Sequence, residues 1–410
     1  MTLANIHLSV ALDGAGWHPA AWREPRARPD ELLSARYWVD AIAEAERGLL
    51  DFVTIEDGLS LQSSRYGEPD ARNDQVRGRL DAVLIASRAA PLTRHIGLMP
   101  TVVATHTEPF HISKAIATLD YVSTGRAGVR VRVSASPSEA AHFGRRELPP
   151  LDIRDRTDPE AKRLANALFD EAADYVEVIR RLWDSWEDDA EIRDAATGRF
   201  IDRDKLHYID FAGEHFSVKG PSITPRPPQG QPLIGALGHA AVPYRLIGRA
   251  ADVGFVTPRD AADAASIAAQ IRAAAADAGR EPGAVHVFGD LVVFLDTPDT
   301  LGADRKARLD ELAGEEYASD AAVFAGSPAQ LADLLLEWHD AGLSGFRLRP
   351  AVVPDDMEAV TRGLVPELRR RGAYRASYEA DTLRGLLGLP RPANRYATAA
   401  PAAAPGGTDS

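Results

Sequence analysis

The sequence predicts a (β/α)8 barrel, an α/β fold in which each parallel strand is followed by a helix. Short β-branched runs alternate with amphipathic helical stretches along most of the chain, a pattern typical of βα units around a parallel sheet. Eight strand–helix pairs can be counted, which favours a closed barrel over an open sheet. The 410 residues suit such a barrel with loop insertions.

The pairs follow one another in chain order. The predicted strands are Asn5–Leu12, Phe52–Ile55, Ile96–Val103, Gly128–Ser134, Leu233–Leu237, Val253–Val256, Val285–Leu295 and Phe346–Leu348. The predicted helices are Glu31–Arg47, Arg79–Arg88, Pro109–Val122, Ala167–Trp186, a segment ending at Ala251, Ala261–Ala278, Pro328–Ala341 and Met357–Arg371.

The segments outside this alternation are interpreted as insertions and a tail. Residues 1–389 form one barrel domain with insertions at about 135–165, 185–231 and 296–327, the second carrying a hairpin around Leu206–Val218. We expect insertions to form a lid over the mouth of the barrel, with substrate specificity in the first two. Residues 390–410 are rich in Ala, Pro and Gly and are predicted to be disordered.

Composition narrows the class of protein. The chain is 45% hydrophobic and 26% charged, as is usual for a globular domain, and its net charge of -13 argues against nucleic acid as a partner. Cysteine is absent, which excludes disulfides, thiolate nucleophiles and Cys-based metal sites. No secretory signal and no apolar run of roughly 20 residues is visible, so a cytoplasmic location is expected.

In a (β/α)8 barrel, functional residues lie at the carboxyl ends of strands and in the loops that follow them. The second strand ends in Glu56-Asp57-Gly58. These carboxylates could contact a ligand or could cap the following helix, and the residues alone favour neither.

The fourth strand alternates valines with Arg130, Arg132 and Ser134. Strand side chains alternate between faces, so the valines should pack on the helices and the arginines should point into the barrel, with Ser134 nearest the mouth. Buried guanidinium groups need partners. A structural ion pair with an acid from a neighbouring strand is the leading interpretation, and an anchor for an anionic group is the alternative.

Several other side chains are predicted near the mouth. His18, His106 and His239 follow strands but lack the spacing of metal ligands, so no metal site is expected. His106 is a candidate general acid or base. Gly238 and His239 precede a helix whose N-terminus could bind a phosphate. Trp17 and Trp22 could enclose a planar ligand or fix their loop.

Five segments together resemble the bacterial-luciferase-like flavin monooxygenases, in the nitrilotriacetate, long-chain-alkane and dibenzothiophene-sulfone monooxygenase branch. They occur in the family's order and are WHPAAWR (17–23), AEAERGLLDFVTIEDG (43–58), TEPFHISKAIATLDYVSTGRAG (107–128), LWDSWEDDA (182–190) and GEHFSVKGPSITPRPPQGQP (213–232). The last two are the most specific.

The resemblance implies FMN bound across the barrel mouth as reduced FMNH2, supplied by a separate NAD(P)H-dependent flavin reductase. Oxygen would add at the flavin C4a, and the resulting (hydro)peroxide would oxidise a small organic substrate, so the enzyme would be a two-component monooxygenase. The cofactor performs this chemistry, while the protein orients it. A homodimer or homotetramer is expected on the same basis.

Carried over residue by residue, Asp57 matches the family's flavin-contacting aspartate. The Ser/Asn position on the third strand is Val103, which could offer only its backbone, and the Trp-Asn of the fourth strand is Val129-Arg130. The phosphate loop, usually Gly then Ser, reads Gly238-His239-Ala240.

The flavin-flanking His and Tyr of the family fall near Ala165 and Phe169. Because these departures concentrate at the flavin site, Arg130 or His239 is expected to provide contacts instead, or flavin binds as a diffusible co-substrate, or the pocket serves another ligand. The resemblance thus predicts catalytic roles for His18, His106 and Arg130, and cofactor binding by Asp57, Val103, Ser134, Gly238, His239 and Ala240.

Two other functions stay open at this point. One is a deazaflavin-dependent oxidoreductase, although the segments at 182–232 argue against it. The other is a non-catalytic barrel subunit that binds little flavin. The sequence does not name the substrate, and the inward arginines slightly favour an anionic or carbonyl-bearing compound.

Overall fold

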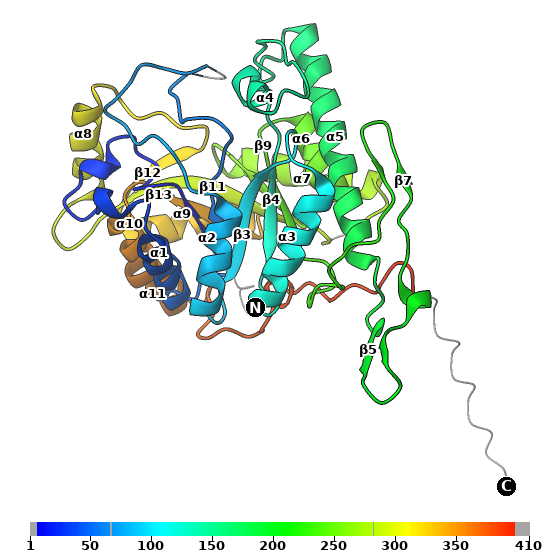
Figure 1. Cartoon of the computed structure of the whole chain (residues 1–410). Helices are drawn as coiled ribbons and strands as arrows, with labels where there is room; N and C mark the ends of the chain where they lie inside the picture. The colour runs from blue at the N-terminus through cyan, green and yellow to red at the C-terminus, as the bar shows by residue number, and fades with distance from the viewer. Residues whose placement is uncertain (1–5, 66–67, 282, 398–410) are drawn as a thin grey trace.

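The computed structural model describes residues 6–397 except 66, 67 and 282. Eight parallel strands close into a barrel in the order β1-β2-β3-β4-β9-β10-β11-β13, with β13 returning to β1. The predicted (β/α)8 barrel is confirmed (Figure 1). The barrel strands are β1 (His7–Leu12), β2 (Phe52–Ile55), β3 (Gly97–Val103), β4 (Gly128–Arg132), β9 (Leu233–Gly238), β10 (Val253–Val256), β11 (His286–Leu295) and β13 (Gly345–Pro350).

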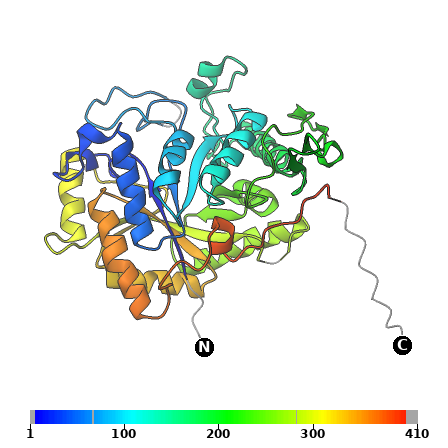
Figure 2. The same cartoon turned by 60° about the horizontal axis from the view of Figure 1, so that its bottom comes forward.

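Helices surround this barrel, as the tilted view in Figure 2 shows. They are α1 (Ala35–Arg47), α2 (Ala82–Ala89), α3 (Pro109–Val122), α5 (Pro159–Asp184), α6 (Ala241–Ala250), α7 (Ala261–Asp277), α9 (Pro328–Asp340), and α10 (Asp355–Ala359) joined through a π-helical turn to α11 (Val365–Arg370). Helix α5 begins at Pro159 rather than at Ala167, because Asp158 accepts a bond from the Glu160 N–H and proline suits the first helical position. None of the helices in the described ranges has the length and apolar character needed to cross a membrane.

The sequence missed several elements inside the insertions. Helix α4 (Pro137–Phe143) lies in 135–165, and α8 (Gly302–Ala313) and β12 (Ala322–Gly326) lie in 296–327. Strand β12 pairs with Leu291–Leu295 of β11, after the first part of β11 has paired with β10. The predicted hairpin near Leu206–Val218 contains only the short strands β7 (Phe211–Ala212) and β8 (Ser217–Val218), and an unpredicted hairpin, β5 (Glu191–Asp194) with β6 (Arg199–Ile201), precedes it.

The amino-terminal end of the barrel is closed by apolar side chains. Leu383, at the start of the short helix α12 (Leu383–Leu386), joins a cluster with Phe52 and Phe288 inside this end. Glycine at positions 97 and 128 admits it, because a Cβ on Gly97 would lie 2.5 Å from a Leu383 methyl. A ligand therefore has to enter from the carboxyl ends of the strands.

Both ends of the insertion 185–231 lie at the amino-terminal end of the barrel, and its part in a lid over the mouth stays a prediction. Helix α5 has 26 residues and therefore rises by roughly 40 Å, so it carries the chain to the opposite end of the barrel. There, the Gln229 side chain bonds to Asp120 and to the carbonyl of Ala127, just before β4 begins. Figure 1 shows α4 and β5 at opposite ends of the molecule.

The end of the described chain packs against this same segment. The Asn394 amide donates to the carbonyls of Asp184 and Trp186, each at 2.8 Å, and Arg391 pairs with Asp188. The prediction of disorder from residue 390 is therefore wrong for 390–397, because polar partners hold this stretch. The rest of the predicted tail, 398–410, lies outside the described residues.

The family-like segments at 182–190 and 213–232 meet in one buried ion pair. Arg226 bonds to Asp184 at 3.0 Å, to Asp188 at 3.0 Å and to the carbonyl of Pro392 at 2.9 Å. The Arg226 and Asp184 side chains are 2% and 4% exposed, so removal of the cation would leave a buried carboxylate short of a partner. The structure thus gives these segments a role in the scaffold.

We expect Arg226→Ala to lower the free energy of unfolding by roughly 3–5 kcal/mol, because a buried pair is broken from one side. Arg391→Ala is the matched control, since it removes the other arginine on Asp188 from an exposed position, and its cost should stay below about 1 kcal/mol. Urea unfolding of both variants measures the difference. Equal losses would contradict the assignment.

Candidate active site

A row of alternating charges crosses the barrel interior toward the mouth. This charged layer consists, in contact order, of Arg130, Glu56, Arg347, Asp290, Arg349 and Asp320. Arg347 bonds to Asp290 through its Nε at 2.9 Å and to Glu56 through an Nη at 3.3 Å. Arg349 reaches Asp320 at 2.6 Å. The inward orientation predicted for Arg130 is confirmed, and its carboxylate partner comes from β2.

These ion pairs determine the protonation of the layer. Burial alone would raise the pKa of Glu56, but the charges of Arg130 and Arg347 outweigh burial and hold this pKa below its usual value. The same balance lowers the pKa of Asp290 beside Arg347 and Arg349. Burial lowers the pKa of Arg130 to about 10, against the opposing effect of Glu56. Glu56, Asp290 and Arg130 are therefore charged at neutral pH.

Above this layer, the carboxyl ends of the strands enclose a cavity of about 650 Å³, here named the mouth cavity. Its walls include residues after β1, β2, β4 and β9, such as Trp17, Asp57, Val133 and His239. Residues 153–156 of the first insertion also line it, so this insertion does lie at the mouth. The volume falls in the range of roughly 300–1,000 Å³ usual for ligand pockets.

The structure brings together four of the nine site residues predicted from the sequence. Asp57, Arg130, His239 and Ala240 line the mouth cavity. Gly238 precedes His239 in β9, Ser134 follows the lining residue Val133, and Val103 ends β3. Asp57 and the Gly238 loop therefore share one rim of the barrel.

Asp57 holds the start of the following helix and also lines the mouth cavity. Its carboxylate accepts N–H bonds from Gly58 at 2.7 Å and from Ala82, the first residue of α2, at 2.9 Å. It thus fixes the loop after β2 while one side faces the mouth cavity. Burial raises its pKa.

His18 and His106 lie away from the mouth cavity lining. The His18 ring bonds to Asp310 at 3.1 Å and accepts the N–H of Ala20, and burial lowers its pKa, so it fixes the loop after β1. His106 stacks on Phe143 beside a separate cavity of about 100 Å³. Neither ring is placed to act on a ligand in the mouth cavity.

The rim beside β9 collects positive groups. The N–H groups of Ala241 and Val242 open helix α6 and have no acceptor within the part of the chain that the structure describes. Arg156 bonds to the carbonyl of His239 at 2.8 Å, and Lys162 also lines the cavity. Among the described residues, no ion pair is found for either cation. A helix N-terminus with such neighbours suits an anion such as a phosphate.

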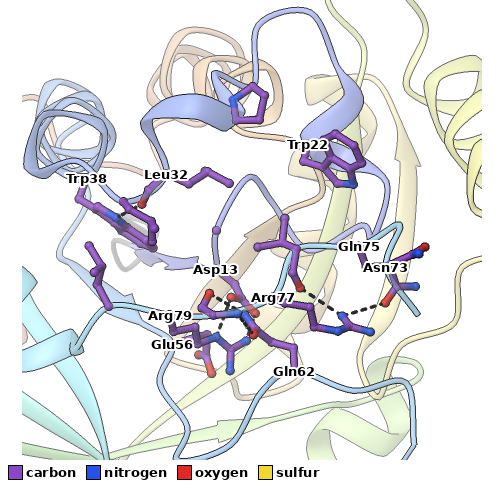
Figure 3. A pocket seen from close by; sticks show the side chains of 16 residues that line it. Asp13, Trp22, Leu32, Trp38, Glu56, Gln62, Asn73, Gln75, Arg77 and Arg79 are labelled. Carbon is purple, nitrogen blue, oxygen red and sulfur yellow. Dashed lines mark hydrogen bonds and ion pairs between the residues drawn. The ribbon is translucent and has the colours of Figure 1, made fainter. Parts of the chain in front are cut away.

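A second, smaller cavity of about 310 Å³ opens beside the mouth cavity, and we name it the side pocket. It lies between the loops after β1 and β2 and the start of α1 (Figure 3). Asp13, Glu56 and Arg79 line both cavities. A compound in the side pocket would therefore contact three side chains that also border the mouth cavity.

Sequence reasoning overlooked most of the charged layer. The strand β13 reads Gly-Phe-Arg-Leu-Arg-Pro, the same alternation that marked Arg130 and Arg132 on β4, and it would have identified Arg347 and Arg349. Asp290 sits alone within an apolar strand, which is itself a signal of an inward acid. Asp320 follows α8 in an insertion, and no period in the sequence points to it.

Asp290→Asn should lower the free energy of unfolding at pH 7 by roughly 3–5 kcal/mol, because two buried guanidinium groups lose a shared carboxylate. The folded pKa of Asp290 is depressed, so its contribution is full above the unfolded value of about 4 and is lost as pH falls through the folded value. The gap between wild type and variant should therefore narrow below about pH 4. Urea unfolding at several pH values tests this.

Asp333→Asn is the control, because Asp333 pairs with Arg371 at the surface and is 70% exposed. We expect this variant to unfold like the wild type. A gap for Asp290→Asn that stays constant down to pH 3 would contradict the charge assignment.

The chain matches known proteins over nearly its full length. The model of the family described as luciferase-like monooxygenase matches residues 16–301. The N-acetyl-S-(2-succino)cysteine monooxygenase of Bacillus subtilis (strain 168) is 32% identical over 96% of this chain and 98% of its own. Nitrilotriacetate monooxygenase component A of Aminobacter aminovorans is 29% identical, with the same coverage.

A solved structure agrees with these sequence matches. That of DmoA from Hyphomicrobium sulfonivorans superposes with a TM-score of 0.78 at 25% identity, covering 93% of this chain and 92% of that one. The resemblance drawn from the sequence segments is confirmed, and with it the class of enzyme. The chain belongs to the luciferase-like monooxygenase family.

Proposed function

We propose that this protein is the oxygenating component of a two-component monooxygenase, which binds reduced FMN in the mouth cavity and oxidises a small organic substrate with O2. Family membership supports the reaction class. The observation that carries the cofactor assignment is the mouth cavity itself. Its rim offers the first N–H groups of α6 together with Arg156 and Lys162, which have no ion pair within the described part of the chain, and its interior is charged and enclosed by protein.

The FMN phosphate is assigned to the rim at the start of α6. The family's hydroxyl-bearing loop is replaced there by Gly238-His239-Ala240, so hydroxyl donors are lost. The N–H groups of Ala241 and Val242 and the ammonium of Lys162 supply donors instead. Residues present at this rim thus fit a phosphate without the usual side chains.

The isoalloxazine ring is assigned to the space between Asp57 and Arg130. Arg130 uses its Nε on Thr101 and one Nη on Glu56, while the other Nη has no recorded acceptor among the described residues. That N–H can donate to a carbonyl or ring nitrogen of the flavin. His18 and His106 have no place in this proposal, because both lie outside the cavity lining.

When bound, reduced FMN supplies the two electrons that activate O2, so that one oxygen atom enters the substrate and the other leaves as water. The protein orients the ring and excludes water. Residues 153–156 and Phe169 cover part of the cavity and contribute to that exclusion.

The remaining assignments concern partners. A relative is named component A, which supports a separate NAD(P)H-dependent flavin reductase as the source of FMNH2. We place both proteins in the cytoplasm, where NAD(P)H is available, and expect a homodimer or homotetramer.

The test of the function is oxygen consumption with a flavin reductase, NADH, FMN and a panel of organic compounds. Without a substrate, the oxygen consumed should be recovered as hydrogen peroxide. A true substrate should lower the peroxide yield and give a product that contains one added oxygen atom from 18O2. If the protein neither changes the peroxide yield with any compound nor binds FMNH2 in an anaerobic titration, the proposal fails.

Lys162→Ala should weaken FMNH2 binding about tenfold, because a charge-assisted hydrogen bond to the phosphate contributes about 1.5–3 kcal/mol. Binding of reduced riboflavin, which lacks the phosphate, should not change. The neighbouring Arg163→Ala is the control, since Arg163 is 69% exposed, pairs with Glu160 and does not line the cavity. Equal losses for FMNH2 and riboflavin would contradict the phosphate assignment.

A further inference from the structure

The side pocket combines an apolar side with polar residues, of which Gln62 bonds to the backbone of Gly78 and Gln75 accepts from Arg77. Trp22 and Trp38 face it from the loop after β1 and from α1, together with Leu32 and Val76 (Figure 3). Both indole N–H groups are already used, on the carbonyls of Asp74 at 3.0 Å and of Leu32 at 2.9 Å. The indoles therefore present apolar ring surface to whatever occupies the pocket.

The charged residues of the side pocket are all paired. Arg79 bonds to Asp13 through two N–H groups, at 3.2 and 2.5 Å. Arg77 bonds to Asp70 at 2.8 Å, and Glu56 belongs to the charged layer. An anionic ligand would lose its hydration here without gaining an unpaired cation, and burial of such a charge is costly.

The mouth cavity differs in this respect. Its rim carries Arg156 and Lys162, for which no ion pair is found in the described ranges. This rim suits an anion, and it is the place assigned to the flavin phosphate. The two adjacent cavities thus differ in charge, with the anion site at the rim of one and a site of balanced charge in the other.

From this difference we infer that the side pocket holds the organic substrate, and that this substrate is a neutral, largely apolar compound with a flat ring or short branched hydrocarbon body. The inference rests on the proposed function. Its reactive atom would lie where the two cavities meet, beside Asp13, Glu56 and Arg79, and would there contact the flavin in the mouth cavity. This replaces the anionic preference that the inward arginines of β4 suggested, because Glu56 pairs with Arg130 and Glu139 with Arg132.

The first experiment compares two probes of nearly equal shape and different charge on the wild-type protein without flavin. Naphthalene-2-carboxamide should bind at least tenfold more tightly than naphthalene-2-carboxylate in calorimetric titrations at pH 7. Equal affinity, or tighter binding of the carboxylate, would overturn the inference.

The second experiment locates the bound amide. Val76→Trp should fill the side pocket and weaken amide binding at least tenfold while leaving the Kd for FMNH2 within twofold, because Val76 does not line the mouth cavity. Leu84→Trp is the control, since Leu84 is 69% exposed and lines neither cavity. Unchanged amide binding in Val76→Trp, or an equal loss of FMNH2 binding, would overturn the location.

The third experiment tests the electrostatic cause. Asp13→Asn removes the carboxylate that neutralises Arg79, so affinity for the naphthoate should rise at least fivefold while affinity for the amide changes little. No gain for the naphthoate would count against the charge argument. The probe titrations contain no flavin. A failure of FMNH2 to bind would therefore contradict the proposed function alone, and the probe titrations would still test which ligand the side pocket binds.

Discussion

The need to pair charges inside the barrel determines the structure of this site. Guanidinium groups that point inward from β4 and β13 are stable there only because Glu56 and Asp290 point inward from β2 and β11. The row also connects strands that are not neighbours, since β4 reaches β2 and β2 reaches β13. The charged layer therefore fixes the carboxyl ends of these strands, and the loops that follow them form both cavities.

This pairing also limits what the interior can do. An arginine that is fully used by carboxylates offers little to a ligand, so Arg347 and Arg349 are best understood as parts of the scaffold. All three arginines line the mouth cavity, and Arg130 differs because one of its Nη groups has no acceptor among the described residues. A ligand that meets this layer thus meets one available donor rather than three positive charges.

Much of the fold could be predicted because strand and helix periods are local properties of the sequence. The eight strands and most helices follow from these periods, and the alternation in Val129–Val133 gave the inward face of β4. The positions of the insertions could not be predicted, because they depend on where α5 ends relative to the barrel. The insertion 185–231 was expected to carry substrate specificity, yet Gln229 near its end bonds to Asp120 and Ala127 at the amino-terminal end of the barrel.

The site was predicted less completely for a related reason. Strand ends identified Asp57, Arg130 and His239, because a parallel barrel brings all carboxyl ends to one rim. Whether a histidine at such an end faces the cavity depends on loop conformation, and His18 turns instead to Asp310 in the distant helix α8. The same holds for the side pocket, whose walls come from segments as separate as Trp22 and Val76. Local patterns locate a rim, but the partners that neutralise each charge on it come from elsewhere in the chain, and those partners decide which ligand the rim accepts.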